Sequence, residues 1–415
     1  MLYGKTDCGL QYAVRKSGTA AAYCALSIRC GTRDEEGYHS GLAHFTEHTL
    51  FKGTDRKTAS VINGYLDKLG GELNAFTTKE EIVIHATVLK EDLGKAANLL
   101  FELATSATFP ETEIGIEKGV VIDEINSYKD SPSEDIYDRF EELLFEGHPL
   151  ASPILGTISS VKKIKRDELL AFVREKFTPE RMAFTVVADM EEKKMEKFVD
   201  RVSAKWFHRQ DGPGAGNAGK EGFRLQDFRA RNKFDKTVNK KNHQVNCVIG
   251  NTAPSLYDDR KRIATILMCN ILGGPASNSI LNYKLREKNG LVYGVECTYT
   301  QYSDSGIVAI CLGCDKENLG KCLDITAREI RKLQDEPLSA GRLAAAKKQF
   351  LGQMAISSDN GETQCLAMGK SLISYGTVLS DECTKAKIEA VGAGEIMEAA
   401  REIFDENSLC RLTFL

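Results

Sequence analysis

The sequence lacks the features that mark secreted, membrane-spanning and nucleic-acid-binding proteins. No stretch approaches the length of a membrane span, and residues 1–16 contain no apolar core of the kind that a secretory signal needs. The net charge is −4 with both signs dispersed, which gives no basic footprint for nucleic acid and no polybasic patch for a membrane surface. We therefore expect a cytoplasmic protein that binds neither nucleic acid nor membranes.

Cysteine pairs at metal-binding or redox spacing are also scarce. The twelve cysteines are widely scattered, and only Cys311 and Cys314 form a C-x-x-C pair. No second pair follows at the spacing of a zinc ribbon, and Cys311 closes the apolar run of residues 306–311. The pattern favours reduced thiols with a buried strand cysteine at Cys311 over a redox or zinc pair.

The chain is long enough for more than one domain. It has 415 residues, of which 42% are hydrophobic and 27% are charged, an ordinary globular composition. Residues 211–222, DGPGAGNAGKEG, are rich in glycine and alanine and poor in large apolar side chains. This segment is the predicted linker between a domain at residues 1–210 and a domain at residues 223–415.

Residues 44–48, His-Phe-Thr-Glu-His, carry a pattern with clear chemical meaning. On a helix, His44 and His48 are four residues apart and project from one face, which suits two imidazole ligands to Zn²⁺. Glu47 lies three residues after His44, close enough to act as a general base on water. The alternative is a helix with two surface histidines and a solvated glutamate.

The two halves of the chain repeat each other. Residues 174–187 align without gaps on residues 401–414, and both segments read as helix, turn and strand. We therefore predict an α+β fold with two homologous α/β sandwich domains, each an antiparallel-rich sheet packed with helices. A second, gapped alignment places the following residues opposite His44, Glu47 and His48: Ala264, Leu267 and Met268. Polar residues on a core-type helix cost burial energy unless something pairs them, which favours a metal.

A third ligand could come from a helix predicted over residues 113–128. Its apolar positions Ile114, Val121 and Ile125 indicate a packed face, and Glu117 and Glu124 share a face because they are seven residues apart. Solvent-exposed glutamates are the usual alternative on a helix. The residues alone leave both interpretations open.

Four segments resemble sequence blocks of the M16 (pitrilysin-like) metallopeptidases, which include insulin-degrading enzyme and the mitochondrial processing peptidase. They are GLAHFTEHTLFKGT, GGELNAFTT, EKGVVIDEINSYKDSP and GHPLASPILGT. The resemblance covers essentially the whole chain and points to the short, two-domain type of this family. Glu124 follows His48 at the spacing of the family's third ligand, and Glu117 matches the supporting glutamate seven residues before that ligand.

The resemblance implies a zinc metalloendopeptidase. His44, His48 and Glu124 would bind Zn²⁺, Glu47 would be the general base, and Glu117 would be a supporting carboxylate that orients a histidine. The substrates implied are peptides or small unfolded proteins.

The same resemblance implies residues that hold the substrate. Asn74, Ala75 and Phe76 would lie on a strand whose free edge pairs with an extended peptide, although an ordinary edge strand is the alternative. Arg286 and Tyr293, seven residues apart, would bind the substrate main chain and stabilise the oxyanion. A surface arginine and a strand tyrosine are the alternative for this pair.

Short members of the family form clam-shell dimers, with zinc from one subunit and the Arg/Tyr pair from the facing subunit. Because this chain carries both sets, the resemblance implies a homodimer with two composite sites. The rivals are a catalytically silent subunit and a site-specific processing subunit of a heterodimer.

Overall fold

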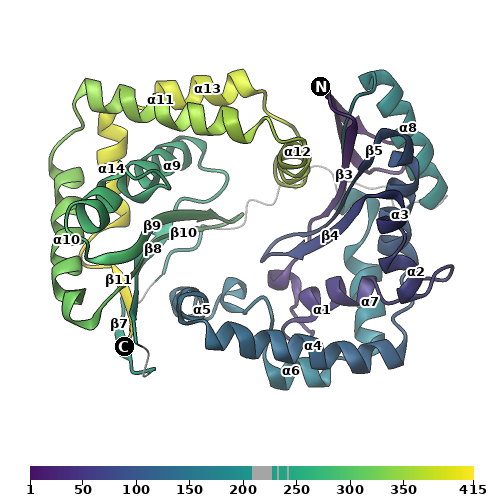
Figure 1. Ribbon diagram of the computed structural model, residues 1–415, viewed down its shortest axis with the longest axis horizontal. Helices are drawn as coiled ribbons and strands as arrows, with labels where there is room; N and C mark the ends of the chain where they lie inside the picture. The colour runs from purple at the N-terminus through teal and green to yellow at the C-terminus, as the bar shows by residue number, and fades with distance from the viewer. Residues whose placement is uncertain (208–226, 231–232, 241–242) are drawn as a thin grey trace. The chain divides into compact units, whose positions relative to one another are not determined.

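The computed structural model describes residues 1–207, 227–230, 233–240 and 243–415 (Figure 1). These residues form two compact units. Unit 1 contains residues 1–126, 152–207 and 356–379, and unit 2 contains residues 127–151, the described residues from 227 to 355, and residues 380–415. The predicted linker, residues 211–222, lies outside the described residues. Each unit includes a segment from the other half of the chain, which the predicted boundaries did not foresee.

Unit 1 is built on a sheet of six strands in the order β1-β2-β6-β3-β5-β4. Strands β2 and β6 are parallel, and the other neighbours are antiparallel. The bounds are β1 (Leu2–Lys5), β2 (Gln11–Lys16), β3 (Ala21–Ile28), β4 (Glu72–Thr77), β5 (Ile82–Leu89) and β6 (Met182–Ala188). Every residue of β6 is buried, because helices cover both faces of the sheet at this strand.

One face of this sheet carries the main core of unit 1, under helices α3 (Leu93–Ser106) and α8 (Glu192–Trp206). Unit 1 also contains α1 (Leu42–Leu50), α2 (Ala59–Asn63), most of α4 (Glu111–Asp130), α6 (Ile158–Lys163) and α7 (Arg166–Lys176). Helix α4 contributes its residues up to Asn126 to unit 1.

The opposite face of the first sheet is covered by α12 (Gly361–Tyr375), which comes from the second half of the sequence (Figure 1). Glycines let this helix approach the strands closely. A Cβ atom at Gly369 would lie 2.3 Å from the Ser27 hydroxyl oxygen, and one at Gly361 would lie 2.4 Å from the Tyr23 ring. Cys365 and Met368 complete the apolar contact.

Unit 2 is built on a sheet of five strands in the order β7-β11-β8-β10-β9. Strands β7 and β11 are parallel, and the other pairs are antiparallel. The bounds are β7 (Asp235–Val238), β8 (Val245–Ala253), β9 (Val292–Gln301), β10 (Gly306–Cys314) and β11 (Cys410–Phe414). The helices of the second half in this unit are α9 (Asp259–Gly273), α10 (Leu319–Asp335), α11 (Ala340–Ser357, as far as residue 355), α13 (Asp381–Ala390) and α14 (Ala393–Ile403), together with a π-helical turn at Asn282–Glu287.

Helix α5 (Pro132–Leu144), from the first half of the sequence, covers the second sheet against β8 and β11. Ile136, Phe140 and Leu144 enter a core with Leu412 and Phe414 of β11. The main core of unit 2 lies on the other face of the sheet and includes residues of α9, α10 and α14. The halves of the chain have therefore exchanged one helix each, and each exchanged helix covers the second face of a sheet.

The predicted duplication is confirmed by the topology. The order β2-β6-β3-β5-β4 in unit 1 matches β7-β11-β8-β10-β9 in unit 2, and the parallel pair falls at the same place in both. Helices α7 and α14 begin and end at positions that the sequence repeat aligns with each other. Helix α1 follows β3, and α9 follows the equivalent strand β8.

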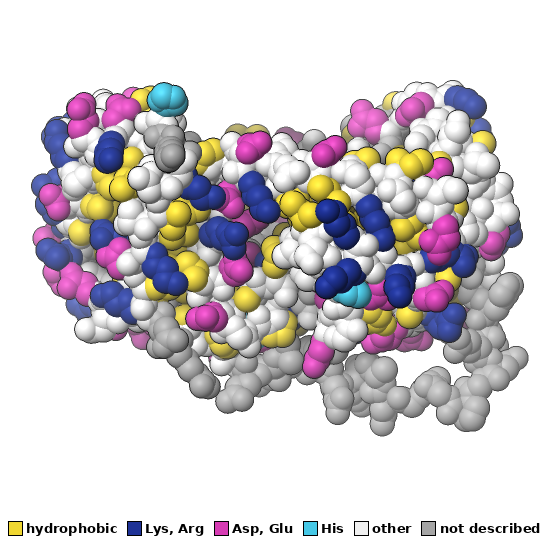
Figure 2. Space-filling model, turned by 90° about the horizontal axis from the view of Figure 1, so that it is seen from below, with side chains coloured by type: hydrophobic (Ala, Val, Ile, Leu, Met, Phe, Trp, Pro, Cys, Tyr) yellow, Lys and Arg dark blue, Asp and Glu magenta, His cyan; other side chains and the backbone are white. Residues whose placement is uncertain are grey.

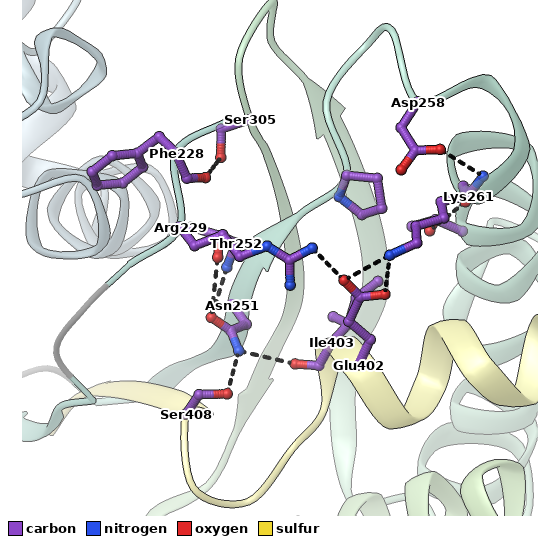
Figure 3. Close-up of polar contacts among 12 residues, drawn as sticks. Phe228, Arg229, Asn251, Thr252, Asp258, Lys261, Ser305, Glu402, Ile403 and Ser408 are labelled. Atoms are coloured by element: carbon purple, nitrogen blue, oxygen red, sulfur yellow. Dashed lines mark hydrogen bonds and ion pairs between the residues drawn. The ribbon is translucent and has the colours of Figure 1, made fainter. Parts of the chain in front are cut away.

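A polar network fixes the segment at Phe228–Arg229 to unit 2 (Figure 3). The Ser305 hydroxyl donates to the Phe228 carbonyl oxygen at 2.9 Å. Arg229 and Lys261 both pair with Glu402 of α14. The Asn251 amide donates to the Ser408 hydroxyl at 2.8 Å. Ser305 and Glu402 thereby hold Phe228 and Arg229 within unit 2.

Charges of both signs are mixed on the face shown in Figure 2, in agreement with their dispersal along the sequence. Within the described part of the chain, none of the helices combines the length and the apolar character that a bilayer crossing demands.

Candidate metal centre

Helix α1 carries His44, Glu47 and His48, and its start is fixed by a buried carboxylate. Glu35 accepts hydrogen bonds from the backbone N–H groups of Gly41 and Ala43 at 2.9 and 2.8 Å. The helix begins after Gly41, which has a φ of 88° and has no side chain to cap the helix. Burial raises the pKa of Glu35 to about 8, although both backbone donors act to lower it. Glu35 satisfies N–H groups that a helix start leaves without partners.

The two imidazoles of α1 converge on Glu124 of α4. Glu124 Oε2 lies 3.7 Å from His44 Nε2 and 3.5 Å from His48 Nε2. Ligand atoms of these three side chains all lie within 4.8 Å of one another, the one such group among the residues that the structure describes. The helical spacing of four residues therefore brings the histidines together as expected, and α4 supplies the carboxylate.

Glu117 lies on the packed face of α4 with Ile114, Val121 and Ile125. Its side chain is only 3% exposed. Glu117 Oε1 lies 2.8 Å from His48 Nδ1, and Glu117 Oε2 lies 2.7 Å from the ammonium group of Lys52. The two glutamates, seven residues apart on α4, therefore have different contacts. Glu124 faces Nε2 of both histidines, and Glu117 contacts Nδ1 of His48.

The surroundings of the two histidines push their proton affinities in opposite directions. Burial, with the nearby charge of His48, lowers the pKa of His44 to about 3. Burial also opposes the charged form of His48, but its hydrogen bond with Glu117 and the charge of Glu47 prevail and raise its pKa. For Glu117, burial is likewise outweighed by its bonds with His48 and Lys52, so its pKa is lowered.

Glu47 is held beside the edge strand β4. The Thr77 hydroxyl donates to Glu47 Oε2 at 3.0 Å. Burial is the largest influence on this carboxyl and raises its pKa, which makes Glu47 a stronger base than an exposed glutamate. Sequence reasoning missed Thr77, although its place two residues after Ala75 on one strand puts both side chains on the same face.

The donor set fits a zinc ion. A tetrahedral ion with bonds of about 2.1 Å separates its ligand atoms by about 3.4 Å, close to the two distances at Glu124. When His48 donates from Nδ1 to Glu117, its Nε2 turns a lone pair toward the Glu124 carboxylate. A lone pair facing an anion is stabilised by a cation between them. His44 Nδ1 is buried and has no hydrogen-bond partner among the described residues, and Nε2 is the nitrogen of this ring that faces Glu124.

The predicted substrate strand, β4, is an edge strand. Asn74 is exposed, and Ala75 and Phe76 are half-buried. Asn74 lies opposite His85 of β5, and the Phe76 and His85 rings are 6.1 Å apart. The three predicted residues therefore lie on the same edge strand as Thr77, whose hydroxyl donates to Glu47.

Arg286 and Tyr293 lie in unit 2, on the π-helical turn and on β9. Both line a cavity of about 680 Å³ within this unit. Tyr293 is 58% exposed, and its hydroxyl donates to Asp315 Oδ1 at 2.8 Å, the bond that chiefly raises its pKa.

The C-x-x-C pair does not form a site. Cys311 and Cys314 both lie on β10, and they pack into cores on different faces of the sheet. Burial raises the pKa of each thiol to about 12. All twelve cysteines are free thiols.

The fold and the cluster define a duplicated protein with one candidate divalent-metal centre in its described residues. Two family models match the chain: "Insulinase (Peptidase family M16)" at residues 12–158 and "Peptidase M16 inactive domain" at residues 163–350. Together they span most of the sequence. The chain belongs to the M16 peptidase family and is of its short, two-domain type.

Curated relatives agree with this assignment. The chain is 28% identical over 380 residues to the uncharacterized zinc protease YmxG of Bacillus subtilis, covering 92% of this chain and 90% of that protein. It is 26% identical over 373 residues to the uncharacterized zinc protease SCO5738 of Streptomyces coelicolor, covering 90% and 80%.

Two crystal structures share the fold. A protease from Helicobacter pylori has a TM-score of 0.86 at 19% identity, with 100% of this chain and 98% of that chain covered. A peptidase M16 inactive domain from Pseudomonas fluorescens has the same TM-score at 20% identity, with 100% and 97% covered.

Proposed function

We propose that this chain is a zinc-dependent metalloendopeptidase that hydrolyses peptide bonds in peptides or small unfolded proteins. The observation that carries the proposal is the convergence of His44 Nε2, His48 Nε2 and Glu124 Oε2, with Glu47 on the same helix. The family and the relatives named zinc proteases support it. The cytoplasmic location expected from the sequence remains part of the proposal.

Zn²⁺ held by His44, His48 and Glu124 would activate water and polarise the scissile carbonyl. Glu47 accepts the proton of the attacking water and returns it to the leaving amine, so that no net proton is lost. Thr77 orients the Glu47 carboxylate through its hydrogen bond. Glu117 holds His48 by Nδ1 and leaves Nε2 free for the metal.

Substrate binding uses the free edge of β4. An extended peptide that adds to this edge gains main-chain hydrogen bonds regardless of its sequence. Asn74, Ala75 and Phe76 would line that peptide, on the strand that supports Glu47. This arrangement favours broad cleavage of extended segments over recognition of a folded surface.

We also propose a homodimeric clam-shell chamber, in which Arg286 and Tyr293 of one subunit serve the zinc site of the other. The cavity that both residues line in unit 2 supports a role in binding. Guanidinium and phenol donors suit a substrate carbonyl and a developing oxyanion. The chain carries both half-sites, so two identical subunits would complete two sites.

The rival functions are a catalytically silent subunit and a processing subunit with one cleavage site. A silent subunit has no need of a complete His44, Glu47, His48 and Glu124 set, and the described geometry favours catalysis for this reason. The match to a model named for an inactive domain falls on residues 163–350, outside these four residues.

The test is Glu47→Gln, with zinc content and hydrolysis of a mixed peptide library measured on the same samples. We expect about one zinc per chain in the wild type and the variant. Hydrolysis should fall by about a thousandfold, because the carboxylate that accepts the proton is gone. Glu111→Gln, an exposed glutamate at the start of α4, is the matched control and should leave both unchanged.

Undiminished hydrolysis in Glu47→Gln would overturn the mechanism, and wild-type protein without zinc or hydrolysis would favour the silent subunit. Cleavage of one library member alone would favour the processing function. For the dimer, Glu47→Gln and Arg286→Ala chains are mixed after reversible dissociation. About a quarter of wild-type hydrolysis should return, because half of the dimers are mixed and each holds one intact composite site. No recovery would count against shared sites.

A further inference from the structure

Lys52 stands directly behind the candidate metal centre. It lies four residues after His48, just beyond the end of α1 at Leu50. Its ammonium group lies 2.7 Å from Glu117 Oε2, and the other oxygen, Oε1, lies 2.8 Å from His48 Nδ1. Three side chains therefore form a chain of contacts from ammonium to carboxylate to imidazole.

The carboxylate at the middle of this chain is almost wholly buried. A buried carboxylate needs a partner at each oxygen, because an unpaired anion inside a protein is costly. Lys52 makes an ion pair with one oxygen and His48 a hydrogen bond with the other, so both ends of the carboxylate are engaged. The direction of the His48 Nδ1–H bond then fixes the rotation of the ring, and with it the direction of Nε2 toward Glu124.

We propose that Lys52 is a positioning residue for zinc, which acts through Glu117 to aim His48. This inference rests on the proposed function, since it assumes that zinc binds at His44, His48 and Glu124. It gives Lys52 a role that a surface lysine would not have. The ammonium touches neither the metal nor the substrate, and its effect is on the affinity for zinc.

Unit 1 contains a matched ion pair that lacks this connection. Lys57 pairs with Glu102 of α3, which is as deeply buried as Glu117. Glu102 also accepts a hydrogen bond from Thr54, and none of these three residues is a candidate ligand. Replacing Lys57 thus removes the ion-pair partner of a buried glutamate in the same unit and does not alter the candidate zinc ligands.

The experiment compares Lys52→Met, Lys52→Arg and Lys57→Met in the full chain. Zinc affinity is measured by competition with a chromogenic chelator, and thermal unfolding is measured on the metal-free proteins. Lys52→Met should weaken zinc binding by about tenfold, the lower end of what outer partners of ligands contribute. Lys52→Arg should retain most of the zinc affinity of the wild type, because arginine keeps the positive charge and the partly exposed position can accommodate the larger side chain. Lys57→Met should destabilise the protein without changing its zinc affinity.

The Glu117→Gln background separates positioning from general destabilisation. If Lys52 acts through Glu117, Lys52→Met should cause no further loss of zinc affinity once Glu117 is an amide. Unchanged affinity in Lys52→Met, an equal loss in Lys57→Met, or a full second loss in the double variant would each overturn the inference. A wild-type chain that binds no zinc would instead overturn the proposed function.

Discussion

Helices α1 and α9 occupy equivalent places in the two units and differ in what they bury. Each follows the central strand of its sheet, β3 or β8, and the strand orders around them match. Helix α1 presents His44, Glu47 and His48. At the positions aligned with these, α9 presents Ala264, Leu267 and Met268, each at most 2% exposed.

The difference shows that the fold can form with apolar residues at these three helix positions. In unit 2 the three residues belong to the main core. In unit 1 the polar version is accompanied by two glutamates of α4: Glu117 contacts Nδ1 of His48, and Glu124 faces Nε2 of both imidazoles. The polar residues of α1 thus stand on a scaffold whose other copy packs the same helix positions with apolar residues.

The largest effect is expected when α1 receives the residues of α9. The triple variant His44→Ala, Glu47→Leu, His48→Met should lose zinc entirely, from about one ion per chain to none, because only Glu124 remains as a ligand. Elemental analysis measures this change. The metal-free variant should still unfold cooperatively, because α9 packs well with the same residues. Zinc at one per chain in the variant would place the metal elsewhere.

The reverse exchange should destabilise unit 2. Leu267 is fully buried, so Leu267→Glu places a carboxyl group in an apolar core without a designed partner. We expect a loss of about 3 kcal/mol or more in the free energy of unfolding, measured by urea denaturation. The control is Leu267→Met, which conserves volume and should cost less than about 1.5 kcal/mol. Equal losses in both variants would mean that packing, and not polarity, separates α9 from α1.

The smallest effect is expected at Glu402 of unit 2, whose carboxylate pairs with Arg229 and Lys261. Burial acts to raise the pKa of Glu402, but its bonds with Lys261 and Arg229 outweigh burial and lower it below the ordinary 4.5 (Figure 3). The folded chain therefore binds fewer protons than the unfolded chain in this range, and stability rises with pH through it. The contribution is fully present above pH 4.5 and is lost as pH falls through the lowered pKa.

Urea unfolding of the wild type and Glu402→Gln measures this contribution. The variant should be less stable by about 1 kcal/mol at neutral pH, since the pair is partly exposed. The difference should shrink as the pH is lowered below the ordinary carboxyl value. A difference that is constant with pH would show that the charge of Glu402 contributes nothing and that the side chain acts by shape alone.

Much of the fold and the site could be predicted because their signals are local or periodic. The four-residue spacing on α1 and the ungapped repeat that closes each half are readable along the sequence. The choice of Glu124 on α4 as the third ligand rested on the family resemblance, because the residues alone left it open. The hydrogen bonds that hold the N-terminus of α1 could not be predicted from the sequence. Glu35 reaches Gly41 and Ala43 across a loop, where no period fixes which carboxylate will approach.

The exchange of helices α5 and α12 was hidden for the same reason. Apolar periodicity predicts that a helix buries one face, but not which sheet it covers. Cys365 and Met368 are apolar enough to fit the core of either unit. The close approach of Gly369 to Ser27, which places α12 on the first sheet, is visible only in the structure.

The late position of α12 in the sequence has a consequence for folding during synthesis. Strands β1 to β6 leave the ribosome early, but the helix that seals their second face is made after β7 to β10. Until then, Ala13, Val83 and Val187 of that face have no helix to cover them. A nascent chain stalled before residue 361 therefore displays an apolar sheet surface, the kind of surface that chaperones bind and that promotes aggregation. The candidate metal centre belongs to a unit whose synthesis begins first and ends only when α12 has been made.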